Sequence, residues 1–351
     1  MYDDFYDLTG KPFQLTPDQR FFFNSQVHHR AMAYLRYGLE QGEGFIVITG
    51  GIGTGKTMLV RALFGELENR NIMAAQLVTT QVGPEDMLRM VCASFGLAHE
   101  GMNKATLLHN LEVIARTRFA EGKHILLVVD EGQNLPASSI EELRMLANFQ
   151  VEGRSLFQSF LLGQEELRHT LQGPGMEQFR QRIIASYHLE PLSEEETRGY
   201  IEYRLKLVGW NGDPTLDERL FPEIFAFTDG VPRRINSLCD RFFLYGCIEE
   251  KHALGLDDLE VVQAEMKREV GQAEEPAAQD PVPMVADLHP VDPPQESQSA
   301  SALADGQSIS SRLASLEEEV RGLRRIVQHE RKLLRKAVLL QLDLEAYDDI
   351  D

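Results

Sequence analysis

The eight residues from Gly50 to Thr57 have the composition and spacing of a phosphate-binding loop, because they fit the pattern GxxxxGK[ST] at every fixed position. Glycines let backbone N–H groups curl around phosphate oxygens, and a helix starting at the end of the loop would add its own unpaired N–H groups. In such loops the lysine, here Lys56, reaches the β and γ phosphates, and the hydroxyl of Thr57 ligates Mg²⁺. The residues expected to hold ATP are Gly50, Gly51, Ile52, Gly53, Thr54, Gly55, Lys56, Thr57 and Met58.

Two consecutive carboxylates, Asp130 and Glu131, follow an apolar run at residues 125–129, about 75 residues beyond the phosphate loop. An aspartate at the carboxyl end of a buried strand can hold Mg²⁺ through water, and the neighbouring glutamate can polarise an attacking water. The expected metal ligands are therefore Thr57 and Asp130, and Glu131 is the expected catalytic residue. A strand ending in Asp-Glu is weak evidence alone, but together with the loop upstream it predicts ATP hydrolysis.

Three further polar residues lie where predicted strands begin or end. Gln164 follows the apolar run 160–162, on the side of the sheet expected to face the γ phosphate. It could orient the attacking water or be a solvated loop amide. Arg180 and Arg182 precede the last predicted strand. Either could reach the nucleotide of a neighbouring subunit as an arginine finger, or be an ordinary surface charge.

A pair of arginines, Arg233 and Arg234, follows the turn residues 230–232 at the head of a predicted helix. The positive end of the helix dipole disfavours cations at that position. A double arginine there therefore indicates an anionic partner.

The elements that must position these residues alternate between two patterns. Short apolar runs predict buried strands at 45–49, 74–78, 125–129, 160–162 and 186–189. Amphipathic stretches between them predict helices, for example at 58–68, 84–95 and 138–149. Strands that are apolar throughout and alternate with helices predict an α/β P-loop NTPase fold, a parallel sheet with helices on both faces.

Composition divides the chain into four parts. Residues 1–192 are the predicted ATPase core, and 193–270 read as an all-helical lid with breaks near 209–214 and 229–232. Residues 271–308 carry six of the 15 prolines and seven acidic side chains but no Lys or Arg, which predicts a disordered linker. Apolar residues at a 3-4 spacing from Leu313 onward predict a C-terminal coiled-coil or partner-binding helix at 309–345, with a helix folded back on the body as the alternative.

The overall charge and the cysteines narrow the class of protein. The chain has 351 residues and a net charge of −20, which argues against a general nucleic-acid binder and against a polybasic membrane-surface protein. Its three cysteines are widely spaced, so neither a disulfide framework nor a zinc site is indicated. No apolar run approaches the ~20 residues of a membrane span, so we expect a cytoplasmic protein.

Taken together, these motifs resemble those of the AAA+ ATPases of the ExeA/general secretion pathway A type. Within that group they most resemble the ATPase that accompanies XrtA/PEP-CTERM (exosortase and exopolysaccharide) systems. The resemblance covers roughly residues 2–270, with Gly132 standing where the group usually has alanine. The matching residues are Pro12-Phe13, Thr16-Pro17-Asp18, Gly50 to Thr57, Asp130 to Leu135, Glu142 to Leu146, Leu162-Gly163-Gln164, Gln181-Arg182-Ile183, Tyr200 to Arg204 and Gly230 to Asn236.

The resemblance implies roles for the weaker positions. It makes Gln164 the sensor 1 residue, Arg182 the arginine finger with Arg180 as runner-up, and Arg233 the sensor 2 residue that reaches ATP from the lid. It also implies ATP and Mg²⁺ as cofactors, a homo-oligomer, and a protein partner in an envelope secretion or polysaccharide system. The resemblance gives no role to the C-terminal helix, which its apolar spacing makes the candidate segment for contact with that partner. The protein would then lie peripherally at the inner membrane through that partner.

Two alternatives belong to other functional classes. One is a DNA-associated AAA+ regulator of the transposition type, against which the net charge of −20 weighs because loading on DNA needs a continuous basic face. The other is a nucleotide-gated scaffold, in which hydrolysis is slow and the C-terminal helix carries the output.

Overall fold

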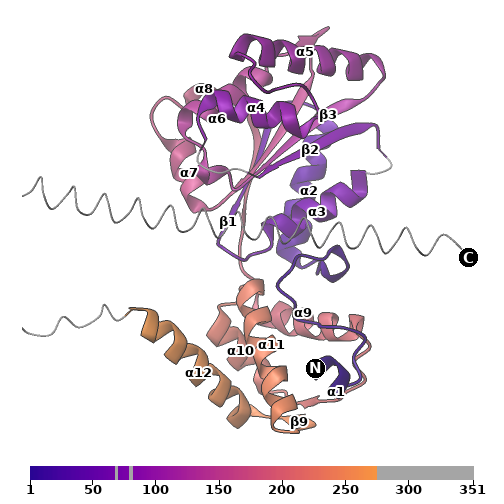
Figure 1. The fold of residues 1–351 in the computed structure, drawn as a ribbon, viewed down its shortest axis with the longest axis vertical. Helices are drawn as coiled ribbons and strands as arrows, with labels where there is room; N and C mark the ends of the chain where they lie inside the picture. Colours follow the sequence, from indigo (N-terminus) through magenta and orange to yellow (C-terminus); the bar gives the residue numbers. More distant parts are fainter. Residues whose placement is uncertain (68–69, 79–81, 275–351) are drawn as a thin grey trace, which may run out of the picture. The chain divides into compact units, whose positions relative to one another are not determined.

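The structure, a computed structural model, describes residues 1–67, 70–78 and 82–274 (Figure 1). The predicted C-terminal helix at 309–345 lies outside these residues. So does the predicted linker, except that the last described helix continues to Glu274, into the range assigned to the linker. Within the described ranges, no helix combines the length and the apolar character needed to cross a membrane.

A parallel sheet forms the centre of the fold. Its five strands lie in the order β2-β3-β6-β1-β7, and every neighbouring pair is parallel. All five predicted strands are therefore confirmed, each within a few residues of its expected bounds. The strands are β1 Phe45–Gly50, β2 Ile72–Val78, β3 His124–Asp130, β6 Phe157–Gly163 and β7 Ile183–Leu189. The polar residues expected at strand ends thus meet at the carboxyl edge of one sheet.

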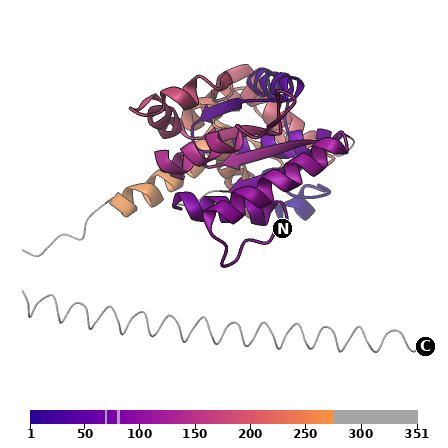
Figure 2. The ribbon, with the colours of Figure 1, turned by 90° about the horizontal axis from the view of Figure 1, so that it is seen from above.

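Alternate residues along the strands face two separate cores. Val47, Leu127 and Leu161 belong to one apolar cluster, whereas Ile48 and Val128 belong to the other, as the two-residue period of a strand requires. Helices cover both faces (Figures 1 and 2). One face carries α2 Gln26–Gln41 and α3 Lys56–Leu67; the other carries α4 Pro84–Ser94, α5 Lys104–Ala120, α6 Ala137–Leu146, α7 Glu165–Gln172 and α8 Glu177–Arg180.

Several short elements complete this part of the chain. A 3₁₀ turn, η1 (Gln19–Phe21), precedes α2, and a second one, η2 (Gly132–Asn134), follows β3 directly. Two short strands, β4 (Gln150–Val151) and β5 (Arg154–Ser155), form an antiparallel hairpin before β6. Among these, η2 matters most for function because it begins at the residue after Glu131.

Between β7 and Glu274, the last residue that the structure describes, the chain is mostly helical. Four helices, α9 Glu194–Leu207, α10 Leu220–Thr228, α11 Pro232–Ile248 and α12 Leu256–Glu274, form what we call the helical region. Ser193 caps α9 through a capping box with Glu196, and proline occupies the first turn of α11, where its missing N–H is harmless. The region also contains a short parallel pair, β8 (Thr215–Leu216) with β9 (Ala253–Leu254), which an all-helical prediction did not include.

The N-terminal residues pack against the helical region rather than the sheet. Tyr2, Tyr6, Phe13 and Phe21 are buried in the same apolar cluster as α9 and α11. The short helix α1 (Tyr2–Phe5) is fixed there by a hydrogen bond of 2.6 Å from the Tyr2 hydroxyl to a carboxylate of α11. The predicted core beginning at residue 1 therefore differs from the observed packing, in which the sheet-bound part begins near Gln26.

Candidate nucleotide-binding site

The phosphate loop, Gly50 to Thr57, joins the carboxyl end of β1 to the start of α3. Two of its glycines have backbone angles that other residues rarely adopt: φ is +82° at Gly53 and +103° at Gly55. A Cβ on Gly53 would lie 2.6 Å from the Cβ of Arg233, and one on Gly55 would lie 2.6 Å from Nε2 of His28. The loop is therefore held tightly by neighbours from α2 and α11.

Lys56 is buried at the first position of α3. Its Nζ donates hydrogen bonds to the carbonyl oxygens of Gly50, at 2.8 Å, and Gly51, at 2.9 Å. Burial lowers the pKa of Lys56, and the charges of Glu131 and Asp130 oppose that shift. An anion bound in the loop would stabilise the ammonium form that burial disfavours.

The side chains of Thr57 and Asp130 meet beside the loop. The Thr57 hydroxyl donates to Oδ2 of Asp130 at 3.0 Å, and the backbone N–H of Glu131 donates to Oδ1 at 3.0 Å. Gln76 of β2 adds a longer contact of 3.4 Å. Burial raises the pKa of the Asp130 carboxyl, with the hydrogen bonds from Thr57 and Glu131 acting in the opposite direction.

A hydroxyl and a carboxylate side by side are the oxygen ligands that Mg²⁺ prefers. In the part of the chain that the structure describes, no group of three or more His, Cys, Asp or Glu side chains could hold a metal by itself. Thr57 and Asp130 thus fit a Mg²⁺ ion that completes its coordination with phosphate and water oxygens, which is the usual arrangement for this ion.

Glu131 stands at a sharp turn between β3 and η2. Its backbone is left-handed, with φ 56° and ψ 36°. Nε2 of Gln133 donates to Oε2 of Glu131 at 2.6 Å, and Nε2 of Gln164 lies 3.5 Å from the same oxygen. The backbone N–H of Gln164 in turn donates to Oε1 of Gln133 at 2.9 Å. The structure therefore brings Glu131 and Gln164 together, with Gln133 between them.

The two arginines at the head of α11 have different surroundings. The backbone N–H of Arg233 donates to the carbonyl of Gly53 at 3.2 Å, and its side chain lines the cavity beside the loop. Arg234 instead forms an ion pair with Asp229 and donates to the carbonyl of Phe227 at 2.6 Å. The pair was expected to meet one anionic partner, but only Arg233 faces the site. Arg234 has an acidic partner of its own.

Arg180 and Arg182 do not line the cavity of their own chain. Arg180 donates to the carbonyls of Leu171 and Gly173, at 2.8 and 3.1 Å, and pairs with Glu177. Arg182 donates to the side-chain oxygen of Asn148. Their assignment as arginine fingers, which act on a neighbouring subunit, stays a prediction.

His28 supports the loop from α2. Its Nε2 lies 3.1 Å from the Thr54 carbonyl, which can only accept, so Nε2 carries the proton and Nδ1 accepts from the Ser25 hydroxyl at 2.8 Å. Burial lowers the pKa of His28, which keeps the ring neutral. Since the C=O and the next N–H of a trans peptide point in opposite directions, holding the Thr54 carbonyl also directs the Gly55 N–H.

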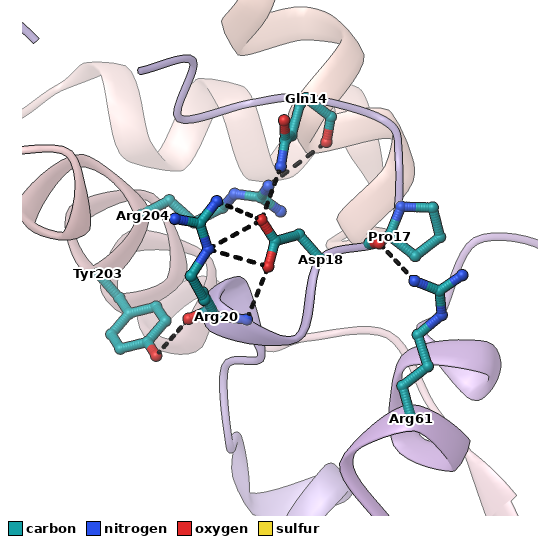
Figure 3. A network of polar contacts seen from close by, with 7 residues as sticks. All are labelled: Gln14, Pro17, Asp18, Arg20, Arg61, Tyr203 and Arg204. Atoms are coloured by element: carbon teal, nitrogen blue, oxygen red, sulfur yellow. Dashed lines mark hydrogen bonds and ion pairs between the residues drawn. The ribbon is translucent and has the colours of Figure 1, made fainter. Parts of the chain in front are cut away.

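A segment near the N-terminus, residues 12–21, connects the two parts of the molecule; we call it the N-terminal strap. Figure 3 shows part of its contacts, including the one between Pro17 and Arg61. Arg61 of α3 donates to the carbonyl of Pro17 at 2.6 Å. From α9, the buried Arg204 donates to the carbonyls of Pro12 and Gln14 and stacks on the ring of Phe21 at 4.6 Å. The strap thus ties the helix that follows the phosphate loop to the helical region.

These segments enclose a cavity of about 380 Å³. Sequence reasoning had identified the loop, the strand ends and Arg233, but gave no role to His28, Gln133 or the strap. The sequence did contain a signal for the strap, since Thr16-Pro17-Asp18 and Tyr200 to Arg204 are among the residues that carry the family resemblance. The cavity is lined by Gln14, Leu15, Thr16, Pro17, Asp18, Phe21, Phe22, Phe23, His28, Ile52, Gly53, Gly55, Lys56, Thr57, Met58, Glu131, Gln164, Leu192, Tyr200, Arg204, Pro232, Arg233 and Asn236.

A parallel α/β sheet with this loop at its carboxyl edge, followed by a helical region, defines the P-loop AAA+ fold. Residues 39–171 match the family described as AAA domain. The chain is also similar to General secretion pathway protein A of Aeromonas hydrophila, with 32% identity over 269 residues. That match covers 76% of this chain and 48% of the relative, so the chain spans about half the length of the curated relative it matches.

Solved structures of ORC and CDC6 proteins share the fold. CDC6p from Pyrobaculum aerophilum has a TM-score of 0.58 at 15% identity, covering 72% of this chain and 70% of that one. The Aeropyrum pernix ORC1 protein in complex with DNA has a TM-score of 0.55 at 17% identity, covering 74% and 70%. The Aeropyrum pernix ORC2 protein, in ADPNP–ADP complexes, has a TM-score of 0.53 at 16% identity, covering 71% and 72%. Likeness at this level of identity shows the fold alone.

Proposed function

We propose that this chain binds Mg²⁺-ATP in the cavity and hydrolyses it. The observation that carries the proposal is that Lys56, Thr57 and Glu131 line one cavity with Arg233. Asp130 lies beside them, hydrogen-bonded to Thr57. The presence of ADPNP and ADP in the Aeropyrum pernix ORC2 structure, which shares the fold, is consistent with nucleotide in such a site.

The residues of the site have separable tasks. Lys56 and the N–H groups of the phosphate loop bind the phosphates, and Thr57 and Asp130 hold Mg²⁺. A bound Mg²⁺ neutralises charge that develops on the phosphate oxygens. Glu131 polarises the attacking water and Gln164 orients it. Arg233 reaches the phosphates from the helical region, which then acts as a lid.

The wall of the cavity away from the phosphate loop suits a nucleoside. The strap contributes Leu15, Pro17 and Phe21 there, and the helical region contributes Tyr200 and Asn236. Apolar surface with a few polar groups is the usual lining of a nucleotide-sized site. The base and ribose therefore lie between the strap and the helical region.

At the level of the cell, we propose that the ATPase drives or regulates an envelope secretion, exopolysaccharide or protein-sorting system. The similarity over 269 residues to General secretion pathway protein A supports a secretion partner. In this proposal the protein is a homo-oligomer in which Arg182, or Arg180, completes the site of the next subunit. It stays in the cytoplasm and reaches the inner membrane through its partner.

Steady-state hydrolysis tests the central claim. Wild type should hydrolyse ATP in a Mg²⁺-dependent manner, Glu131→Gln should bind ATP but turn it over at least about a hundredfold more slowly, and Lys56→Ala should lose binding. The assay is run with and without the candidate secretion partner. If the wild-type rate never exceeds that of Glu131→Gln, the chain is a nucleotide-gated scaffold and hydrolysis is refuted.

Mixed oligomers test the finger in trans. Arg182→Ala keeps an intact site but supplies no finger, whereas Glu131→Gln supplies a finger but has an inactive site. Mixing the two inactive variants should restore activity, and mixing Arg180→Ala with Glu131→Gln serves as the matched comparison. No restoration with either arginine would contradict a finger at these positions.

Binding to DNA is the outcome that would redirect the cellular proposal. The net charge of −20 argues against it, and the likeness to the ORC1 protein in complex with DNA concerns the fold only. Titration of DNA binding against salt, with ATP present, measures it directly. Tight binding that weakens steeply with salt would replace the secretion partner with a nucleic acid.

A further inference from the structure

Gln133 bridges two strand ends at the edge of the cavity. It lies in η2, the 3₁₀ turn that begins directly after Glu131, and its side chain reaches back toward the carboxyl end of β6. One end of its amide contacts the Glu131 carboxylate, and the other contacts the backbone of Gln164. It does not itself line the cavity, so any effect on bound nucleotide must pass through Glu131 or Gln164.

The direction of this bridge is fixed by its partners. The backbone N–H of Gln164 can only donate, so the amide oxygen of Gln133 must face it, at 2.9 Å. The NH₂ end is then forced toward Glu131, where it donates to Oε2 at 2.6 Å. A flipped amide would lose both hydrogen bonds and set an oxygen against a carboxylate. Because β3 and β6 are neighbours in the sheet, the Glu131 carboxylate faces the NH₂ group of Gln133 and not its amide oxygen.

The surroundings leave the Gln133 side chain little freedom. Gly163, the last residue of β6, would bring an added Cβ to 3.0 Å from Oε1 of Gln133 and 2.7 Å from Cδ2 of Leu167. Leu135, at the end of the turn, is buried and anchors it to the core beneath the sheet. The contact between Gln133 and Glu131 is therefore part of a packed unit, not a chance meeting of two surface side chains.

We propose that Gln133 is a positioning residue that orients the Glu131 carboxylate for ATP hydrolysis. This inference rests on the proposed function, because it concerns the same glutamate. Glu131 sits on a left-handed residue at the end of β3, and its own backbone therefore gives its side chain no support from a regular helix or strand. Gln133 supplies that support and links Glu131 to the carboxyl end of β6, because it accepts the backbone N–H of Gln164, the residue directly after that strand.

A small error in orientation is expected to affect turnover more than binding. Displacement of a reacting group by about 1 Å can slow a reaction about a hundredfold, and a hydrogen bond to a charged group carries a comparable effect. The phosphates are held by Lys56 and the loop, which Gln133 does not touch. Losing Gln133 should therefore lower kcat while leaving the affinity for ATP in place.

The experiment compares two substitutions at Gln133 with one control. Gln133→Met keeps the length of the side chain but removes both hydrogen bonds, and Gln133→Glu keeps its shape but cannot donate to a carboxylate. Gln172→Met makes the same chemical change at an exposed residue of α7. We expect kcat to fall about ten- to hundredfold in Gln133→Met, further in Gln133→Glu, and not in the control. The dissociation constant for ATP should change by less than about twofold, and the melting temperature confirms folding.

A double-mutant cycle separates positioning from a general structural effect. Combined with Glu131→Gln, the Gln133→Met change should cause no further loss, because residues that act as a unit are not additive. An unchanged or raised kcat in Gln133→Met, or a loss of ATP affinity equal to the loss of kcat, would overturn the inference. If wild type itself is no faster than Glu131→Gln, hydrolysis and this inference both fail. If wild type is clearly faster than Glu131→Gln but Gln133→Met has the wild-type kcat, the inference alone is refuted and the proposed hydrolysis stands.

Discussion

Gly53 is the point where the phosphate loop meets the helical region, and replacing it with alanine tests that contact. Its carbonyl accepts the backbone N–H of Arg233, and its φ of +82° lies in the range that other residues avoid. A Cβ there would stand 2.6 Å from the Cβ of Arg233 and 3.2 Å from Cγ1 of Val231. Since the nearer atom is bonded directly to the backbone, either the loop or the start of α11 must move.

The magnitude follows from two terms. A non-glycine residue in the left-handed region costs about 1–2 kcal/mol, and relief of the close contact adds about 1 kcal/mol, so we expect Gly53→Ala to lose about 2–3 kcal/mol of stability. At about 2–4 °C per kcal/mol for a domain of this size, the melting temperature should fall by about 5–10 °C. Displacing Arg233 from the loop should also weaken ATP binding at least about tenfold.

Gly51→Ala is the matched control, since an added Cβ there would meet only Cγ2 of Thr54, at an ordinary 3.6 Å. Thermal unfolding with and without Mg²⁺-ATP, together with titration of a fluorescent ATP analogue, measures both effects. The free energy of unfolding of Gly51→Ala should stay within about 0.5 kcal/mol of the wild-type value. Equal losses in the two variants, or none in Gly53→Ala, would show that the contact between Arg233 and Gly53 does not hold the loop as described.

Three further substitutions test the support of the site. Lys56→Met should change the stability of the nucleotide-free protein by less than about 1 kcal/mol, because removal of the buried ammonium, whose pKa is lowered by burial, offsets the loss of its hydrogen bonds to the carbonyls of Gly50 and Gly51. The same variant should lose the rise in melting temperature caused by Mg²⁺-ATP, about 2.7 kcal/mol of stabilisation at a hundredfold excess over the dissociation constant. Because burial also lowers the pKa of His28, the folded protein binds fewer protons there than the unfolded chain. Its contribution to stability is complete above the ordinary pKa of about 6.5 and is lost as pH falls through the lowered value. His28→Gln, which keeps a donor for Thr54, should flatten the acid side of melting temperature plotted against pH, and an unchanged slope would contradict this. Arg204→Met should cost about 2–3 kcal/mol by leaving strap carbonyls without a donor, whereas Arg234→Met, at an exposed ion pair, should cost less than about 1 kcal/mol; chemical denaturation compares them.

The sheet could be predicted from the sequence because its strands are apolar throughout. Buried strands such as β1 and β3 leave no room for polar residues, so runs like 45–49 and 125–129 stand out from the amphipathic helices around them. The two long helices α2 and α5 were not among the examples that the sequence singled out. In α5, Leu108 and Ile114 lie partly buried beside the fully buried Leu107 and Leu111, and this broad apolar surface obscures a single stripe.

The site could be predicted as far as its motifs are local. Lys56, Thr57, Asp130 and Glu131 each stand at the end of a predicted strand or the start of a helix, and the carboxyl ends of parallel strands meet at one edge. Gln133 could not be assigned in this way, because its role depends on β6 lying next to β3. The strand order is set by the crossover connections between strands, and the sequence around Gln133 contains no information about it.

The N-terminal strap changes how the helical region can respond to nucleotide. The backbone passes between the sheet and the helical region twice, once after β7 and once between the strap and α2, so the region is not attached by a single flexible connection. Arg61 adds a third tie, from α3 to Pro17. Because α3 begins at Lys56, a shift of this helix on phosphate binding would be passed to the strap through Arg61, and from the strap to α9 through Arg204. Arg233 offers a second and direct route from the loop to α11. In the proposed complex, ATP would therefore act on the helical region through α9 and α11 together, and a conformational change of this region would have to keep or break both sets of contacts.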